Sequence, residues 1–280
     1  MPALLKGALA ALGLAVLATG CASTSTRATT AAKLDTILAG PHRSAENRAR
    51  DAARHPKETL LFFGLRPEMT VLEVWPDPAG WYTEIIAPLV REEGKYYASI
   101  IGGDPASQNI TNRITAFRAK LDANPLLYGK VEVTTFAPGA DEMAPPGSLD
   151  MVLTFRNIHN WMARGWAPEA FQKMHRALKP GGVLGVVEHR GDPSKPQDPQ
   201  AKSGYVNEQY AIDLIQAAGF KLVAKSEINA NPKDTRNYEQ GVWTLPPVFR
   251  LGEKDREKYA AIGESDRMTL RFKKVAKPTP

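Results

Sequence analysis

Polar side chains that could move a proton or hold an anion lie just after two apolar runs of the chain. Arg156, Asn157 and His159 follow the first run, and Glu188 and His189 end the second. An imidazole exchanges a proton near neutral pH, so His159 is the candidate general base, with Asn157 and Arg156 beside it. His159 fits equally well a strand-end histidine that only bonds to a neighbouring loop. His189 fits either a second base or a polar residue paired with Glu188.

Arg156 and Arg190 indicate an acidic substrate, because a guanidinium fork matches the geometry of a carboxylate. The alternative is that each arginine pairs with an acidic residue of the same pocket. Glu188, His189 and His159 are potential metal ligands, but their spacing matches no known ligand pattern, so we predict no metal site. Aromatic and polar residues near the strand ends are predicted to line a substrate pocket: Trp75, Trp81, Tyr82, Trp161, Glu188 and His189.

The elements that must position these residues alternate along the chain. The predicted strands cover 71–75, 96–101, 131–136, 151–155, 183–188, 220–227 and 267–274. The predicted helices cover 44–64 with a break at Pro56, 82–90, 110–121, 168–178 and 206–218. This alternation predicts an α/β fold, a doubly wound, mostly parallel, seven-stranded sheet with helices on both faces. In such sheets ligands bind at the carboxyl ends of the strands.

Composition excludes several classes of protein. The chain has 280 residues, is 43% hydrophobic and 24% charged, and carries a formal net charge of +6, which is ordinary for a globular protein. A mild positive charge of this size does not predict nucleic-acid binding. One cysteine permits no intramolecular disulfide and no cysteine-based zinc site. The sequence lacks the nucleophile-elbow, P-loop and dinucleotide-binding glycine motifs, which argues against the matching hydrolases and dehydrogenases.

The N-terminus has the pattern of a secretion signal. Residues 1–20 carry one early charge, Lys6, followed by an uncharged run too short to span a bilayer comfortably. The segment Leu17–Cys21 resembles a bacterial lipoprotein signal, which implies lipidation of Cys21 and a periplasmic, membrane-anchored protein. Ala22 is not an inner-membrane retention residue, which favours the outer membrane. The alternatives are a plain signal peptide or core helix with an unmodified cysteine, and an uncleaved anchor with a cytoplasmic domain.

The rest of the chain is divided by composition. Residues 21–43, rich in Ser, Thr and Ala, are predicted to be the lipidated cysteine and a flexible tether. Residues 44–280 are predicted to form one domain, with an irregular insertion at 229–251. The late position of this insertion and its Trp243 indicate a possible lid over the site.

Several strings carry a family resemblance. Leu72-Glu73 before a turn, Ser148-Leu149-Asp150 opening a strand, Leu178–Gly182 before another, and Ala218-Gly219-Phe220 resemble the class I S-adenosylmethionine-dependent methyltransferase fold. The strings GWYTEIIAP, TFRNIHNWM, SEINANPKDT, GVWTLPP and IGESDRMTLRF resemble a bacterial family of predicted methyltransferases, many of them exported. The resemblance covers roughly Ala45 to Lys277.

The resemblance implies S-adenosylmethionine as cofactor and assigns its contacts. The turn after the first strand would face the methionine part, an acid after the second strand would hold the ribose hydroxyls, and the end of the third strand would lie near adenine. The segment Phe155–Trp161 would lie beside the reactive methyl group. The cofactor-binding residues implied are Glu73, Pro76, Asp77, Gly80, Asp104 and Phe136.

The sequence departs from the family pattern in the turn after the first strand. Of the usual three glycines only Gly80 remains, and each missing glycine removes a backbone position at which φ > 0 is easily adopted. The second strand also ends without an acid, so Asp104 would have to reach from a longer loop.

Two interpretations of function follow. The first is an S-adenosylmethionine-dependent methyltransferase acting on a small-molecule acceptor. The second is an exported lipoprotein that keeps the fold as a non-catalytic ligand-binding module, since fold alone does not determine function. The second is favoured by the altered turn and by the export signal, because the cofactor is made in the cytoplasm. Both imply a small-molecule partner, a membrane reached through the lipid anchor, and no nucleic acid.

Overall fold

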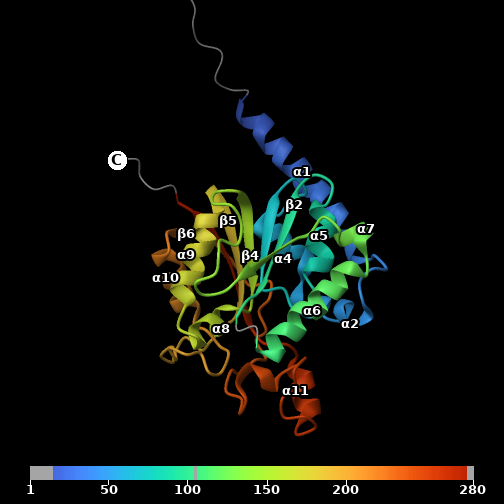
Figure 1. Cartoon of the computed structure of the whole chain (residues 1–280). Helices are drawn as coiled ribbons and strands as arrows, with labels where there is room; N and C mark the ends of the chain where they lie inside the picture. Colours follow the sequence, from blue (N-terminus) through green and yellow to red (C-terminus); the bar gives the residue numbers. More distant parts are fainter. Residues whose placement is uncertain (1–14, 104–105, 276–280) are drawn as a thin grey trace, which may run out of the picture.

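A computed structural model of the chain describes residues 15–103 and 106–275, with side chains from residue 26 onward. Its centre is a seven-stranded sheet in the order β3-β2-β1-β4-β5-β7-β6 (Figure 1). All neighbouring strands are parallel except β7, which runs antiparallel to both β5 and β6. The predicted doubly wound, mostly parallel α/β fold is therefore confirmed.

The strands lie close to their predicted positions. They are β1 (Thr70–Val74), β2 (Lys95–Ile101), β3 (Glu132–Phe136), β4 (Leu149–Phe155), β5 (Leu178–His189), β6 (Phe220–Ser226) and β7 (Arg267–Lys274). The helices are α1 (Ala15–Leu38), α2 (Ala45–Arg48), α3 (Asp51–Arg54), α4 (Pro56–Phe63), α5 (Thr83–Val90), α6 (Gln108–Asp122), α7 (Pro125–Tyr128), α8 (Ile158–Ala163), α9 (Ala167–Ala177), α10 (Glu208–Ala217) and α11 (Arg256–Ile262). Short helices such as α7, α8 and α11 lack the long apolar period that a sequence pattern needs.

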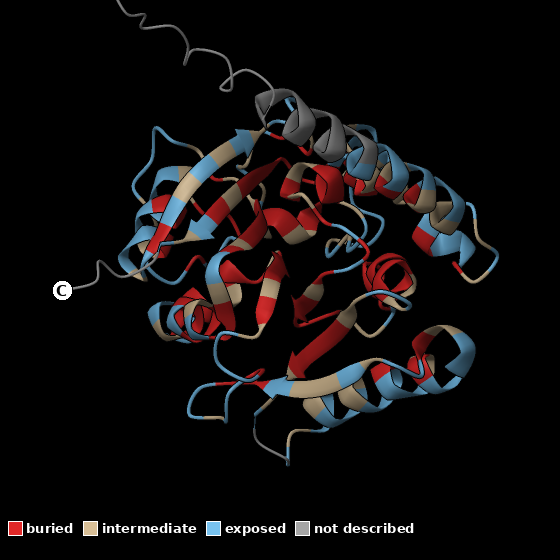
Figure 2. Cartoon of the chain, turned by 90° about the horizontal axis from the view of Figure 1, so that it is seen from above, coloured by how far each residue is buried: buried red, intermediate tan, exposed pale blue. Residues whose placement is uncertain are grey.

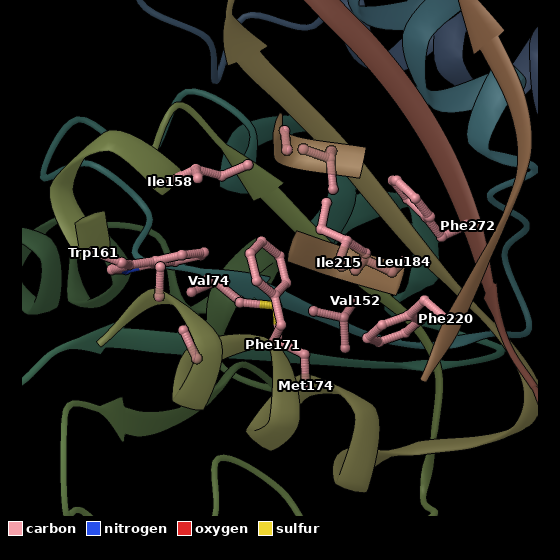
Figure 3. Close-up of a cluster of buried hydrophobic side chains, with 14 of the residues drawn as sticks. Val74, Val152, Ile158, Trp161, Phe171, Met174, Leu184, Ile215, Phe220 and Phe272 are labelled. Carbon is pink, nitrogen blue, oxygen red and sulfur yellow. The ribbon is translucent and has the colours of Figure 1, made fainter. Parts of the chain in front are cut away.

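Helices cover both faces of the sheet and divide the core into two clusters. On one face α9 and α10 pack on β5 and β6, and on the other α4, α5 and α6 pack on the central strands. Buried residues occupy the strands and the inner faces of these helices, while the outer helix faces are exposed (Figure 2). In the first cluster Trp161 lies beside Val74 and Phe171, with its ring 5.6 Å from that of Phe171 (Figure 3).

The segment 44–64 forms three short helices, where two halves separated at Pro56 were predicted. Pro56 begins α4, a position where a missing N–H costs nothing, and Gly64 ends it with φ +83°. The preceding His55 has φ +42°, so the chain turns between α3 and α4. The break predicted at Pro56 is confirmed.

The predicted flexible tether is wrong over residues 26–38. These residues belong to α1, which packs on α4 and α5, and Thr30 and Leu34 are buried there. Arg27 Nη1 also donates to the backbone oxygen of Leu61 at 2.8 Å. An Ala- and Thr-rich composition suggested a tether, but one buried leucine and these contacts hold the helix to the domain. The side chain of Cys21 lies outside the described residues.

The C-terminal part of the chain before β7 lies at one end of the sheet. The segment 229–251 contains one short 3₁₀ helix, η1 (Gly241–Thr244), in keeping with its predicted irregular character. Figure 1 shows α11 at the same end of the molecule as α8, where the parallel strands end. Among the described residues no helix combines the length and apolarity required of a bilayer span.

Candidate functional site

A cavity of about 180 Å³ opens where β1 and β4 lie side by side. The chain winds outward from β1 in one direction and from β4 in the other, so this is the switch point at which open α/β sheets bind ligands. The lining comes from the ends of β1, β4 and β5 and from α6: Glu73, Trp75, Asp77, Tyr82, Arg113, Phe155, Arg156, Asn157, Asn160 and His189.

The turn after β1 is held by its own side chains. Trp75 adopts φ +50°, a conformation that glycine accepts more readily. Asp77 Oδ1 accepts hydrogen bonds from the backbone N–H groups of Ala79 and Gly80, at 2.9 and 3.1 Å. Gly80 has φ +62°, and a Cβ there would meet the side chain of Lys120 at 3.0 Å. The turn is therefore well defined although two of the usual glycines are missing.

Glu73, next to the last residue of β1, is buried. Its carboxyl is 4% exposed and accepts hydrogen bonds from the hydroxyls of Thr83 and Tyr96. Burial raises the pKa of Glu73 to about 7, with the hydrogen bonds opposing the rise. At neutral pH this acid is therefore only partly charged.

The end of β4 presents three consecutive pocket residues. Phe155 stacks on Tyr82, with ring centroids 3.4 Å apart. Arg156 turns the backbone at φ +61° and its N–H donates to the oxygen of Val187 at 2.7 Å. The amide of Asn157 donates to the backbone oxygen of Val74 at 2.9 Å, which joins the ends of β1 and β4.

His159, in the first turn of α8, forms a buried pair with Glu188 at the end of β5. Its Nδ1 lies 3.0 Å from Glu188 Oε1, and its Nε2 lies 3.1 Å from the amide nitrogen of Asn160. With the proton on Nδ1, the imidazole donates to the carboxylate, and Nε2 keeps a lone pair for accepting a proton. The carboxylate thus fixes the ring and would stabilise it when charged.

His189 comes close to this pair. Its ring centroid lies 5.4 Å from that of His159, and its Nδ1 bonds to the hydroxyl of Ser265. Burial, followed by the charges of His159 and Arg156, lowers the pKa of His189 well below its usual range. We expect His189 to remain neutral, so it is a weak candidate for a second base.

The three residues considered as metal ligands do converge. One ligand atom each of His159, Glu188 and His189 lies within 4.8 Å of the others, which their spacing in the sequence did not indicate. However, both oxygens of Glu188 already accept two N–H groups each, from the backbone of Ile158, His159 and His189 and from the His159 ring. This arrangement suits a carboxylate that orients a histidine.

A second cavity of about 190 Å³ lies on the other side of His159. Trp243, from the insertion 229–251, lines it, and its ring meets that of His159 edge-on at 5.9 Å. Asn160 lines both cavities, so they adjoin at this residue. The insertion therefore reaches His159 through Trp243 at this second cavity.

Several predicted site residues lie elsewhere. Trp81 is 1% exposed and donates to the backbone oxygen of Asn47, and Trp161 is fully buried in the core. Both were predicted to line the pocket, and the prediction is wrong because each indole is needed for packing. Pro76, Gly80 and Phe136 are buried and do not line the cavity either. Asp104 falls outside the described residues.

Arg190 is also wrongly grouped with Arg156. Its guanidinium bonds to Asp266 at 2.9 Å and to Glu227 at 2.7 and 2.8 Å. Of the cavity residues, Arg113 was missed, and Asn160 was expected only as part of the segment Phe155–Trp161. Arg113 is an ordinary polar position of a predicted helix, and no sequence signal distinguishes it.

The architecture is shared with many solved structures. A SAM-dependent methyltransferase from Aquifex aeolicus superposes with a TM-score of 0.55 at 18% identity, covering 81% of this chain and 93% of that one. The [4+2]-cyclase SpnF gives 0.56 at 15% identity, covering 91% and 97%. A sarcosine dimethylglycine methyltransferase from Galdieria sulphuraria, itself named as putative, gives 0.50 at 13% identity, covering 83% and 88%. No protein-family model matches the chain, and no curated protein matches it.

The fold is that of the class I S-adenosylmethionine-dependent methyltransferases. Glu73 and Asp77, which the resemblance implies would face the methionine part of the cofactor, both line this pocket. The place assigned to adenine beside Phe136 is filled by Trp75, whose Nε1 donates to the backbone oxygen of Phe136 at 2.8 Å. A cavity of about 180 Å³ is smaller than the roughly 300 Å³ usual for ligands of this size, so adenine fits only if the indole moves.

Proposed function

We propose that the protein is an S-adenosylmethionine-dependent methyltransferase acting on a small-molecule acceptor. The observation that carries the proposal is the His159–Glu188 pair, which lies at the strand ends where this fold performs its chemistry. The pair is buried, and His159 lines the second cavity, which adjoins the cavity at the switch point of the sheet through Asn160.

The chain's own residues supply proton transfer and alignment. The bound cofactor would supply an activated methyl group, leaving the protein to position the acceptor and accept its proton. His159 Nε2 takes the proton of an acceptor O–H or N–H group, and Glu188 stabilises the resulting imidazolium. Asn160, which bonds to Nε2 in the structure, gives way to the acceptor at this atom.

Trp243 and the stacked pair Tyr82–Phe155 give the site apolar walls. Trp243 lies against His159, and Tyr82 closes the cavity on the β1 side. Exclusion of water strengthens the hydrogen bond between His159 and Glu188. A flat or partly apolar acceptor would fit the second cavity, beside His159 and Trp243, and leave the first cavity to the cofactor.

A second candidate function is supported by Trp75. Its indole packs against Phe136, Trp161 and Trp166, with centroids 6.2, 5.9 and 5.8 Å away, and fills the adenine place. This favours a non-catalytic ligand-binding module that kept the fold. A structural neighbour is named as a cyclase, so this architecture is found in proteins whose names are not those of methyltransferases.

Calorimetric titration of the full chain in detergent with S-adenosylmethionine and S-adenosylhomocysteine separates the two functions. The methyltransferase proposal expects micromolar binding to the wild type. Trp75→Gly removes the indole at a position of positive φ and is expected to tighten binding at least tenfold. Trp75→Phe keeps a ring in place and is the matched control.

If wild type and Trp75→Gly both remain folded and neither produces heat at millimolar cofactor, the methyltransferase proposal fails. Binding that appears only in Trp75→Gly would support the ligand-binding module, because the Trp75 indole would then block cofactor binding in the wild type. Thermal unfolding of each variant checks the fold, since truncating a buried Trp costs roughly 3 kcal/mol or more.

The proposal also places the protein in the periplasm, held to the membrane by lipid on Cys21, with the outer membrane favoured. The sequence of residues 1–21 supports this placement. Metabolic labelling with a fatty acid is expected to mark the wild type and not Cys21→Ser, which should leave the membrane fraction. Labelling of Cys21→Ser would overturn the anchor.

A further inference from the structure

The side chain of Arg156 faces the cavity without an ion-pair partner among the described residues. Its backbone is fixed on both sides, by the bond to Val187 and by Asn160 Nδ2 at 3.5 Å from its carbonyl oxygen. Its guanidinium lines the cavity and has no hydrogen bond or ion pair with any residue in 26–103 or 106–275. An arginine held at φ +61° costs about 1 kcal/mol or more, and such strain concentrates at functional sites.

A second unused guanidinium faces the same space from another element. Arg113 of α6 lines the cavity and likewise has no partner within the described part of the chain. Two arginines from the end of β4 and from α6 therefore reach one small cavity. Neither nearby carboxylate pairs with them, because Glu73 bonds to the hydroxyls of Thr83 and Tyr96, and Asp77 bonds to backbone N–H groups of its own turn.

The protein behind the cavity adds more positive charge. Arg50, Arg54 and Arg267 share one carboxylate, Glu264, at 2.8, 3.2 and 3.2 Å. Arg54 is 1% exposed, and both of its Nη atoms lack hydrogen-bond partners among the described residues. Burial lowers the pKa of Arg54 well below its usual range, and Arg156 adds to this effect. Three arginines share one carboxylate here, so an anion in the nearby cavity would offset the remaining positive charge.

We propose that the cavity between β1 and β4 binds the carboxylate of a small molecule, held by Arg156 and Arg113. The guanidinium forks match the two oxygens of a carboxylate, and a volume of about 180 Å³ suits an amino-acid-sized group. The carboxylate belongs either to an acidic acceptor or to the amino-acid end of S-adenosylmethionine. Only the second source rests on the proposed function.

Calorimetry with three probes distinguishes these sources. The probes are succinate, S-adenosylmethionine, and 5′-methylthioadenosine, which has no carboxylate. The variants are Arg156→Gln and Arg113→Gln, with Arg118→Gln as control because Arg118 is an exposed residue of the same helix and lines neither cavity of the site. The two pocket variants are expected to weaken carboxylate binding at least tenfold and Arg118→Gln less than twofold.

Weaker binding of S-adenosylmethionine with unchanged 5′-methylthioadenosine binding assigns the site to the cofactor. Weaker binding of succinate alone assigns it to an acidic acceptor. Succinate binding that depends on Arg156, in a protein that binds neither adenosine compound, would sustain this inference while the proposed function fails. The inference is overturned if no carboxylate probe binds the wild type at 10 mM, or if both pocket variants bind the probes as the wild type does.

Discussion

Two arginines at the ends of neighbouring strands have opposite surroundings. Arg190, after β5, contacts Asp266, Glu227 and Glu208. Arg156, after β4, meets none of the described acids at ion-pair distance and faces a cavity. The same residue type one strand apart therefore serves the fold in one place and is left free for a ligand in the other. A strand-end arginine is informative about function only once its partners are known.

The difference arises from the chain that covers each strand end. Asp266 precedes β7, the antiparallel strand beside β5, so it comes within reach of Arg190. Arg236 of the insertion bonds to the same carboxylate. No such acid is supplied beside β4, whose other neighbour, β1, ends in the buried Glu73 and the turn at Asp77. Topology thus decides which arginine is paired.

The largest expected effect is on folding. Arg190→Ala removes one of the two arginines that bond to Asp266, which is 1% exposed, and should lower the free energy of unfolding by about 3 kcal/mol, because Arg236 still pairs with this carboxylate. Arg156→Ala should change it by less than about 0.5 kcal/mol, because no pair is broken. Urea denaturation of both variants measures the contrast. Equal losses would show that Arg156 has a structural partner and would end the comparison.

The charge of Glu264 gives the next effect. Arg54, Arg267 and Arg50 outweigh the burial of Glu264 and hold its pKa at about 2. The folded state therefore releases this proton more readily than the unfolded one, and its contribution of about 3 kcal/mol is lost as the pH falls from about 4.5 to 2. Glu264→Gln should flatten acid denaturation in this range. An unchanged acid slope would contradict the pairing with three arginines.

Glu73 should behave with the opposite sign. Burial raises its pKa to about 7, so the folded state keeps the proton that the unfolded state loses near pH 4.5. Stability is then expected to fall by roughly 3 kcal/mol as the pH rises from about 4.5 to 7. Glu73→Gln should remove this decline, measured as unfolding free energy across that pH range. A variant that declines as steeply as the wild type would show that Glu73 is ionised throughout.

The smallest expected effect comes from relieving the backbone strain at Arg156. Glycine adopts φ +61° without steric cost, so Arg156→Gly should raise the free energy of unfolding by about 0.5 kcal/mol after its own entropy loss. The same variant should lose carboxylate binding. A clear destabilisation would mean that the guanidinium contributes to folding, contrary to its lack of partners in the described chain.

The sequence predicted the scaffold well and the site less well. Apolar runs and helical periods located the seven strands, because burial imposes those patterns locally. Residues directly after a strand, such as Arg156 and His189, could be placed at the pocket for the same reason. The sequence could not tell whether Trp81 and Trp161 lie in the core or in a pocket, because a tryptophan in either place has the same local sequence pattern. Arg113 and Trp243 reach the site only through tertiary contacts.

By itself the sequence determined the fold class, the strand ends that carry the polar residues, and the altered turn after β1. It did so because secondary structure and burial leave local periodic signals. Only the tertiary structure decided that His159 pairs with Glu188, that Trp75 fills the place assigned to adenine, and that Arg156 stays free while Arg190 does not. These outcomes depend on distances between segments far apart in the chain, which no local pattern records.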